Sequence, residues 1–165
     1  MHLMRPGGGV LDVAAGHGRH THALLEHGYT VTAADVDMSA FTDQPNLNRV
    51  EVDLEAEAWP FSASSFDGIV MTNYLHRPHF PHLIEALAPG GVLLIETFGE
   101  GNEKLGRPRN PEFLLKPGEL LDAFGRHLHV VAYEHCAEHE PRPAVRQRIC
   151  VVKADGPMPC NQKPG

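Results

Sequence analysis

The sequence predicts an α/β protein with a doubly wound, mostly parallel sheet of seven strands, and three observations carry this prediction. Short apolar or β-branched runs alternate with helical segments along most of the chain, which is typical of strand–helix–strand units. Residues 92–95 are apolar without alternation, as expected of a central parallel strand covered on both faces. Residues 128–134 and 145–152 then predict a C-terminal antiparallel hairpin at or near one edge of the sheet.

The first predicted strand comprises residues 10–13, a short apolar run that enters a glycine turn. Residues 19–27 predict a helix that ends at Gly28, where a left-handed backbone cap is expected. Residues 29–34 are rich enough in β-branched side chains to form the second strand, which stops at Asp35. The chain therefore opens with a strand, a glycine loop, a helix and a strand that ends in an acid.

The third and fourth strands are predicted at residues 48–52 and 66–71, the first ending at Asp53 and the second near Asn73. A helix should follow, because Pro81 suits a first helical turn and the Pro-Gly-Gly sequence at 89–91 suits a stop. The residues that this helix is expected to bury are Leu83, Ile84 and Leu87.

Residues 99–116 are irregular, and a connection of that length inside a compact domain is usually functional or disordered. Residues 117–124 predict a further helix before Gly125, with Leu120, Leu121 and Phe124 buried. We expect one domain, a core at residues 1–154, followed by a disordered tail at 155–165 that holds three prolines and almost nothing apolar.

Composition narrows the classes of partner. The chain has 165 residues, of which 42% are hydrophobic, enough for one ordinary core. A net charge of -7 disfavours a nucleic acid partner, since the surface would repel phosphates. Three cysteines, an odd count, favour reduced thiols, and neither a membrane-spanning run nor an apolar signal region is present in the sequence. We therefore expect a cytoplasmic protein that contacts neither membrane nor nucleic acid.

The glycine loop at residues 12–18 is the first candidate binding element. It follows a strand and opens a helix, the context in which a loop backbone approaches a nucleotide-like ligand. Asp12 adds information, because a carboxylate before the loop would oppose a bound pyrophosphate and welcome a cationic ligand. A tight turn without a ligand remains the alternative for the glycines alone.

Acidic residues follow two further strands. Asp35 ends the second strand where nucleotide-binding folds place an acid that accepts hydrogen bonds from ribose, and Asp37 is an alternative for the same role. Asp53 ends the third strand, and Leu54 after it is suited to packing against an aromatic base. Because carboxyl ends of parallel strands share one edge of a sheet, we expect Asp12, Asp35 and Asp53 to converge on a single crevice.

On these residues the sequence resembles the class I S-adenosylmethionine-dependent methyltransferases, from about residue 8 to residue 152. The resemblance implies a Rossmann-like sheet, S-adenosyl-L-methionine as cofactor and methyl transfer to a small-molecule acceptor. It also implies a set of cofactor-binding residues: Asp12, Ala14, Gly16, Gly18, Asp35, Asp53, Leu54 and Asn73, with Tyr74 beside Asn73. Residues 113–121 are similar to a segment of the small tellurite-resistance methyltransferase group, which does not identify a substrate.

Catalytic residues stay open at this point. Methyl transfer is an in-line displacement that needs alignment more than a base. If the acceptor must lose a proton, Tyr74 and His76 are the candidates. Arg107 and Arg109 in the irregular segment are candidates for binding an anionic acceptor, with a solvated loop as the alternative.

No metal site is expected. Pro78 and Pro81 interrupt the helix that a ligand spacing of His76, His79 and His82 would need, and residues 135–139 lack the spacing of a zinc site.

Two rival functions are considered. A nicotinamide-dependent oxidoreductase would prefer a glycine or alanine at Thr21 and no carboxylate at Asp12. An inactive or purely cofactor-binding module is the second rival, because methyltransferases of this class usually carry one or two helices before the first strand and residues 1–9 leave no room for them. Three explanations for the missing helices stay open: a misassigned start, a truncated chain, or a partner protein that covers the cofactor in their place. A homodimer is possible.

Overall fold

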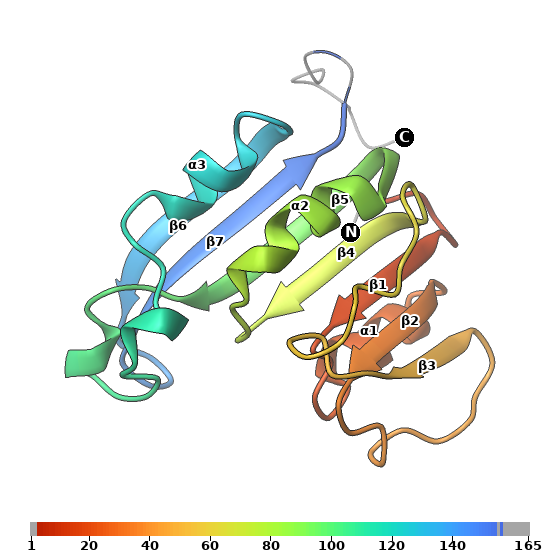
Figure 1. Ribbon diagram of the computed structural model, residues 1–165, viewed down its shortest axis with the longest axis horizontal. Coiled ribbons are helices and arrows are strands. Elements are labelled where there is room, and N and C mark those ends of the chain that lie inside the picture. Colours follow the sequence, from red (N-terminus) through yellow and green to blue (C-terminus); the bar gives the residue numbers. More distant parts are fainter. Residues whose placement is uncertain (1–2, 155, 157–165) are drawn as a thin grey trace.

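The computed structural model describes residues 3–154 and residue 156. In chain order the elements are β1 Gly9–Val13, α1 Arg19–Glu26, β2 Thr30–Asp35, β3 Leu47–Glu51, β4 Phe66–Thr72, α2 Phe80–Ala86, β5 Leu87–Phe98, α3 Glu119–Phe124, β6 His129–Glu138 and β7 Ala144–Val152 (Figure 1). Three 3₁₀ turns lie between them, at Arg77–His79, Asn102–Lys104 and Pro111–Phe113. The predicted core at residues 1–154 thus covers all of these elements, whereas the predicted tail lies almost wholly outside the described residues.

The seven strands form one sheet in the order β3-β2-β1-β4-β5-β7-β6. The first five strands in the chain run parallel, and β7 pairs antiparallel with both β5 and β6. This confirms the predicted doubly wound sheet with its antiparallel hairpin. Strand order moves outward from β1 to β3 and then returns to β4, so the switch point lies between β1 and β4, where sheets of this kind bind ligands.

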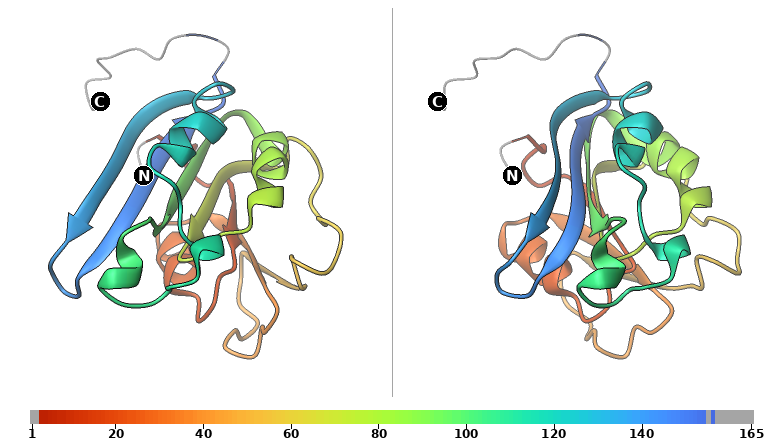
Figure 2. Two further views of the ribbon diagram at one scale, coloured as in Figure 1. Left: turned by 60° about the vertical axis from the view of Figure 1, so that its left-hand side comes forward. Right: turned by 90° about the vertical axis from the view of Figure 1, so that its left-hand side faces the viewer.

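Helices cover the two faces of the sheet unequally (Figure 2). On one face α2 packs over β5 and α3 packs over β7 and β6, and Leu83, Leu120 and Phe124 belong to the main core. On the other face α1 packs through Leu24 against Val10 and Val31. Beyond α1, that face has no helix over β4, β5, β7 and β6 among the described residues, and Leu94 of β5 keeps 36% of its surface exposed. One half of this face is therefore open.

The predicted end of the helix at the Pro-Gly-Gly sequence was wrong, because the observed helix ends earlier. Helix α2 stops at Ala86, because Leu87 already has an extended backbone and pairs with Phe66 as the first residue of β5. The Pro-Gly-Gly segment lies inside β5, and Gly91 accepts a hydrogen bond from Lys153 beyond the end of β7. Ile84 is half-buried, so only Leu83 and Leu87 are fully buried as expected.

The helix after the irregular segment is also shorter than predicted. It begins at Glu119, two residues after Pro117, with Gly118 in the left-handed conformation before it. Leu120 and Phe124 are buried as expected, but Leu121 is 36% exposed on the outer side of this short helix. Cys136 and Cys150 carry free thiols. Every described helix is too short or too polar to span a membrane.

Candidate functional site

A cavity of about 360 Å³ lies at the carboxyl ends of β1 to β4, and we call it the acidic cavity. It is lined by the ends of β2 and β3, by the glycine loop and by the segment after β4. Its lining residues are Ala14, Asp35, Val36, Val52, Asp53, Leu54, Glu55 and Tyr74. Five of the residues singled out by the sequence, Ala14, Asp35, Asp53, Leu54 and Tyr74, therefore share one cavity at the switch point.

The glycine loop takes a shape that needs small residues. Ala14 and Gly16 have φ values of 54° and 55°, and Gly18 has a φ of 80°. A Cβ atom on Gly18 would lie 2.6 Å from a ring carbon of Phe41, so only glycine fits there. The amide of Gly16 donates a 2.8 Å hydrogen bond to Oδ2 of Asp35, which ties the loop to the end of β2.

Asp35 and Asp37 lie in different environments. Asp35 lines the acidic cavity, and its Oδ1 accepts a hydrogen bond from the amide of Asp37 at 3.2 Å. Asp37 is fully exposed and does not line the cavity. Hydrogen bonds from the hydroxyl of Ser39 and from its amide, the latter at 2.8 Å to Oδ1, lower the pKa of the Asp37 carboxyl. Asp35 is therefore better placed than Asp37 to bind a molecule in the acidic cavity.

Asp53 is oriented by its own turn. Its Oδ1 accepts hydrogen bonds from the amides of Glu55 and Ala56, at 3.0 and 3.1 Å, as in an Asx turn. Leu54 beside it is buried and belongs to the main core. A carboxylate and an apolar side chain thus sit next to each other on the cavity wall.

Asp12 lies beneath the loop and does not line the cavity. Its side chain is 2% exposed, and Oδ2 accepts a 2.6 Å hydrogen bond from the hydroxyl of Thr21 on α1. Burial raises the pKa of the Asp12 carboxyl, and the Thr21 hydrogen bond opposes that rise. Of the three carboxylates expected to converge, Asp35 and Asp53 face one cavity, while Asp12 holds the loop against α1.

Asn73 closes the end of β4 in a left-handed conformation, with a φ of 55°. Its amide donates to the carbonyl of Glu96, and its Oδ1 accepts a 2.8 Å hydrogen bond from Arg146 of β7. Arg146 also pairs with the Glu96 carboxylate at 3.1 Å and lies over the Phe98 ring at 4.3 Å. The sequence analysis missed Arg146, because nothing in the sequence connects positions 73 residues apart.

A ring cluster made of Trp59, Tyr74, His76, His79 and His82 packs behind the acidic cavity. Three buried polar atoms in it lack a hydrogen-bond partner among the described residues: Nε1 of Trp59, the hydroxyl of Tyr74 and Nε2 of His79.

Burial and the neighbouring Glu55 carboxylate raise the pKa of Tyr74. Burial, with the nearby His76 and His82, lowers the pKa of His79 to about 4. At neutral pH the side chains of Tyr74 and His79 are therefore uncharged. His76 is half-buried in the ring cluster, with its ring centroid 4.4 Å from that of His79.

The two arginines suggested for anion binding, Arg107 and Arg109, are exposed and line neither the acidic cavity nor the open sheet face. The segment that carries them is anchored by other residues. Asn102 donates to the carbonyl of Pro108 and accepts from the amide of Val145, and Arg77 forms a two-point ion pair with Glu119. Geometry therefore favours the solvated-loop reading for Arg107 and Arg109. No group of side chains with metal-binding geometry occurs among the described residues.

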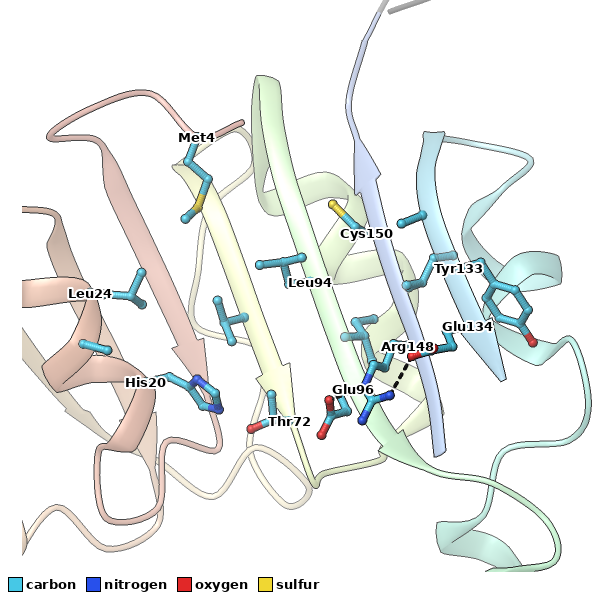
Figure 3. Close-up of a pocket in the computed structure, with 15 residues that line it drawn as sticks. Met4, His20, Leu24, Thr72, Leu94, Glu96, Tyr133, Glu134, Arg148 and Cys150 are labelled. Atoms are coloured by element: carbon cyan, nitrogen blue, oxygen red, sulfur yellow. Dashed lines mark hydrogen bonds and ion pairs between the residues drawn. The ribbon is translucent and has the colours of Figure 1, made fainter. Parts of the chain in front are cut away.

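A second cavity lies on the open half of the sheet, and we call it the apolar groove (Figure 3). Its volume is about 600 Å³, and Leu24, Val70, Leu94 and Cys150 are among its walls. His20, Thr72, Glu96, Glu134 and Arg148 contribute polar groups. The sequence analysis did not find this groove, because it arises from the absence of a helix over four strands, and strand sequences do not show what covers them.

Comparison with known proteins points to methyltransferases. Residues 10–91 match the family described as "Methyltransferase domain". A curated demethylmenaquinone methyltransferase from Renibacterium salmoninarum is 28% identical over 120 residues, which cover 67% of this chain and 50% of that protein. The chain thus spans about half the length of this curated relative.

Solved structures agree on the fold. TehB from Haemophilus influenzae has a TM-score of 0.69 at 18% identity, covering 88% of this chain and 57% of that one. A Burkholderia thailandensis 1,6-didemethyltoxoflavin-N1-methyltransferase, solved with its acceptor and S-adenosylhomocysteine, has a TM-score of 0.66 at 20% identity, covering 93% and 74%. At these sequence identities the likeness shows a shared fold and nothing further about function.

Proposed function

Because the chain belongs to the class I S-adenosylmethionine-dependent methyltransferases, we propose that it binds S-adenosyl-L-methionine in the acidic cavity and transfers the methyl group to a small-molecule acceptor. One observation carries the proposal. Asp35 and Asp53 stand at the ends of the adjacent parallel strands β2 and β3 and face the same cavity, which the glycine loop closes from β1.

The residues of the cavity fit an adenosine. Each Asp35 oxygen takes one backbone donor, so each keeps a second acceptor position for a ribose hydroxyl. Asp53 can accept from an exocyclic amine while the adenine ring packs on Leu54. The methionine portion would extend along Ala14 and Gly16 towards Asn73, with Gly18 shaping the turn and the buried Asp12 beneath it adding negative potential below the sulfonium.

When bound, the cofactor would supply a methyl group to a lone pair of the acceptor, and the electron pair of the broken carbon–sulfur bond would stay on sulfur. The protein's task is alignment and exclusion of water. The raised pKa of Tyr74 keeps its hydroxyl protonated at neutral pH, so Tyr74 acts as a donor or as a wall and not as a base. If an acceptor must lose a proton, His76, which is half-buried in the ring cluster, is the residue we propose to take it.

The acceptor is proposed by class alone. The relatives named above act on a demethylmenaquinone and a didemethyltoxoflavin, which are small molecules. A small-molecule acceptor suits this chain as well, because the net charge of -7 works against a nucleic acid. Arg107 and Arg109 are assigned no part in binding the acceptor, since neither side chain lines the acidic cavity or the apolar groove.

Calorimetric titration with S-adenosylhomocysteine tests the cofactor site, and NAD is the control ligand. Asp35→Asn should weaken the binding of S-adenosylhomocysteine at least tenfold. Asp37→Asn, two positions away and fully exposed, should leave this affinity unchanged. Equal loss in both variants, or tighter binding of NAD, overturns the proposal. Turnover with a panel of small acceptors then separates an active enzyme from a module that only binds the cofactor.

A further inference from the structure

Arg77 donates hydrogen bonds from all three nitrogens of its guanidinium group. Nε and Nη2 bind the two carboxylate oxygens of Glu119, at 2.5 and 3.0 Å, in the two-point arrangement that a planar fork makes with a carboxylate. Nη2 also donates to the carbonyl of Leu114 at 2.9 Å, and Nη1 donates to the carbonyl of Glu112 at 2.8 Å. We call these contacts the Arg77 clamp. It joins segments that lie 35 to 42 residues apart in the sequence.

The carboxylate of Glu119 completes the clamp from the other side. Its Oε2 accepts a 2.7 Å hydrogen bond from the amide of Lys116. The side chains of Arg77 and Glu119 are only 34% and 19% exposed, so solvent screens this pair less than it screens an ion pair on the open surface. The backbone of the segment and the arginine thus fix the carboxylate together.

The clamped segment belongs to the connection between β5 and α3, which the sequence predicted to be functional or disordered. On the side of β7, Gln147 donates to the carbonyl of Lys116 at 2.6 Å, and Oδ1 of Asn102 accepts from the amide of Val145 at 3.1 Å. Gln147 and Asn102 are both buried. Arg77 attaches the same connection on the side of β4. Contacts on two sides therefore order this connection.

Arg77 also belongs to the turn that carries the candidate base. It opens the 3₁₀ turn Arg77–His79 directly after His76, and the amide of His79 donates to the carbonyl of His76 at 3.0 Å. Tyr74, two residues before His76, lines the acidic cavity. A displacement of Arg77 would therefore carry His76 with it. A misplacement of about 1 Å can slow a catalytic step about a hundredfold, so the hold on this turn matters for the chemistry.

We propose that Arg77 is a positioning residue for methyl transfer: the clamp joins the turn of His76 to residues 112–119 and so fixes the direction of the His76 imidazole. This inference rests on the proposed function for the role of His76. Arg77 lines neither the acidic cavity nor the apolar groove, so it acts through His76 and not on the substrate. The alternative is an ion pair that stabilises the chain without fixing His76.

Arg77→Met breaks the clamp, and Arg49→Met is the matched control. Arg49 pairs with Asp43, donates to the carbonyl of Phe41 at 3.0 Å and has a side chain that is 36% exposed, close to the 34% of Arg77. Both variants therefore lose a partly exposed ion pair and a bond to a carbonyl, but only the first lies beside the ring cluster.

Limited proteolysis tests the hold on the segment. Trypsin cleavage after the exposed Arg109 should accelerate at least tenfold in Arg77→Met, because a segment must open locally before a protease can cut it. The rate should stay close to that of wild type in Arg49→Met. An unchanged rate in Arg77→Met would show that the clamp does not hold the segment, and would overturn the proposal.

Proton NMR reads the placement of His76. The Cε1 proton resonance of His76, assigned by its loss in His76→Gln, depends on the ring current of His79, whose centroid lies 4.4 Å away. At about pH 8.5, where a histidine of ordinary pKa is neutral, this resonance should shift in Arg77→Met and not in Arg49→Met. No shift in Arg77→Met, or equal shifts in both variants, means that the ion pair is structural only and overturns the proposal.

Glu119→Ala breaks the clamp from its other end with the opposite change of charge, and it replaces Arg77→Met if that variant does not fold. The His76 resonance should shift in this variant too. Shifts of similar size and opposite sign in the two clamp variants would follow the lost charges and not the geometry, and would contradict the proposal.

Titration of the wild-type chain with S-adenosylhomocysteine separates the two possible failures. If it binds and the His76 resonance does not respond to Arg77→Met, the positioning role alone fails. If it does not bind, the proposed function fails, and the role of Arg77 in methyl transfer fails with it.

Discussion

The hydroxyl of Thr21 donates a 2.6 Å hydrogen bond to Oδ2 of Asp12, and both side chains are buried. This contact joins the first turns of α1 to the end of β1 beneath the glycine loop. It also explains how a carboxylate can be buried there, since a buried charge is tolerated only with a hydrogen-bond partner.

Thr21→Val should destabilise the fold by about 1–3 kcal/mol, because the substitution keeps the shape of the side chain and removes the donor to a buried carboxylate. The Asp12 pKa should rise further, since the Thr21 hydrogen bond lowers it. Urea denaturation measures the first effect and carboxyl carbon NMR the second. In the Asp12→Asn background Thr21→Val should cost less; an equal cost in both backgrounds would mean that the hydroxyl contributes packing alone.

Gly18→Ala should destabilise the chain by about 1–3 kcal/mol, because the new methyl group combines a φ of 80° with a 2.6 Å contact to the Phe41 ring. Gly106→Ala is the control, since nothing lies within 4 Å of its Cβ position and its backbone is not left-handed. It should be neutral or slightly stabilising. Thermal unfolding compares the two, and similar melting temperatures would refute the steric argument.

Arg146 acts on the proposed cofactor site through Asn73, so we expect a positioning role that the sequence does not reveal. Arg146→Met keeps much of the alkyl contact with Phe98 and removes the hydrogen bond to Asn73. S-Adenosylhomocysteine affinity should fall roughly threefold to tenfold, about the worth of one hydrogen bond. Arg142→Met, at an exposed loop position, should leave affinity unchanged. An unaltered affinity in Arg146→Met would show that the hydrogen bond to Asn73 does not position the cofactor site.

The strands and the acids at their ends were predictable because both depend on local pattern. An apolar run followed by Asp35 or Asp53 specifies a strand and its carboxyl end, and the parallel topology then brings the two acids to one edge. The end of α2 was not predictable from the Pro-Gly-Gly sequence. The pairing of Leu87 with Phe66 of β4 draws the backbone into the sheet before the stop signal is reached.

Other features depend on contacts between distant residues. The sequence analysis compared Thr21 only with the glycine or alanine of another enzyme class, whereas its hydrogen-bond partner Asp12 lies on another element. Arg146 reaches Asn73 across the sheet, and the apolar groove depends on which strands a helix leaves uncovered. Leu121 has the same local pattern as Leu120, and only the direction in which α3 packs decides that one is buried and the other is exposed.

His79 should make stability depend on pH between about 4 and 6.5. Its side chain is 4% exposed, and burial beside His76 and His82 lowers its pKa from 6.5 to about 4. The unfolded chain therefore binds a proton in this window that the folded chain does not, so stability falls as the pH is lowered from 6.5 towards 4. Above pH 6.5 the contribution no longer changes with pH. The loss from this residue should amount to roughly 3 kcal/mol at most.

Denaturation of wild type and His79→Phe at a series of pH values isolates this effect from the other histidines. Phenylalanine retains a ring among Trp59, Tyr74 and His76 and cannot titrate, so the variant should lose much of the acid sensitivity between pH 6.5 and 4. It should also gain stability, because Nε2 of His79 is a buried polar atom without a described partner. His127→Phe, at an exposed position after α3 and outside the ring cluster, is the control and should keep the acid sensitivity that His79 gives. If both variants keep the wild-type profile, the fold accommodates a protonated His79, and burial does not lower the pKa of this residue.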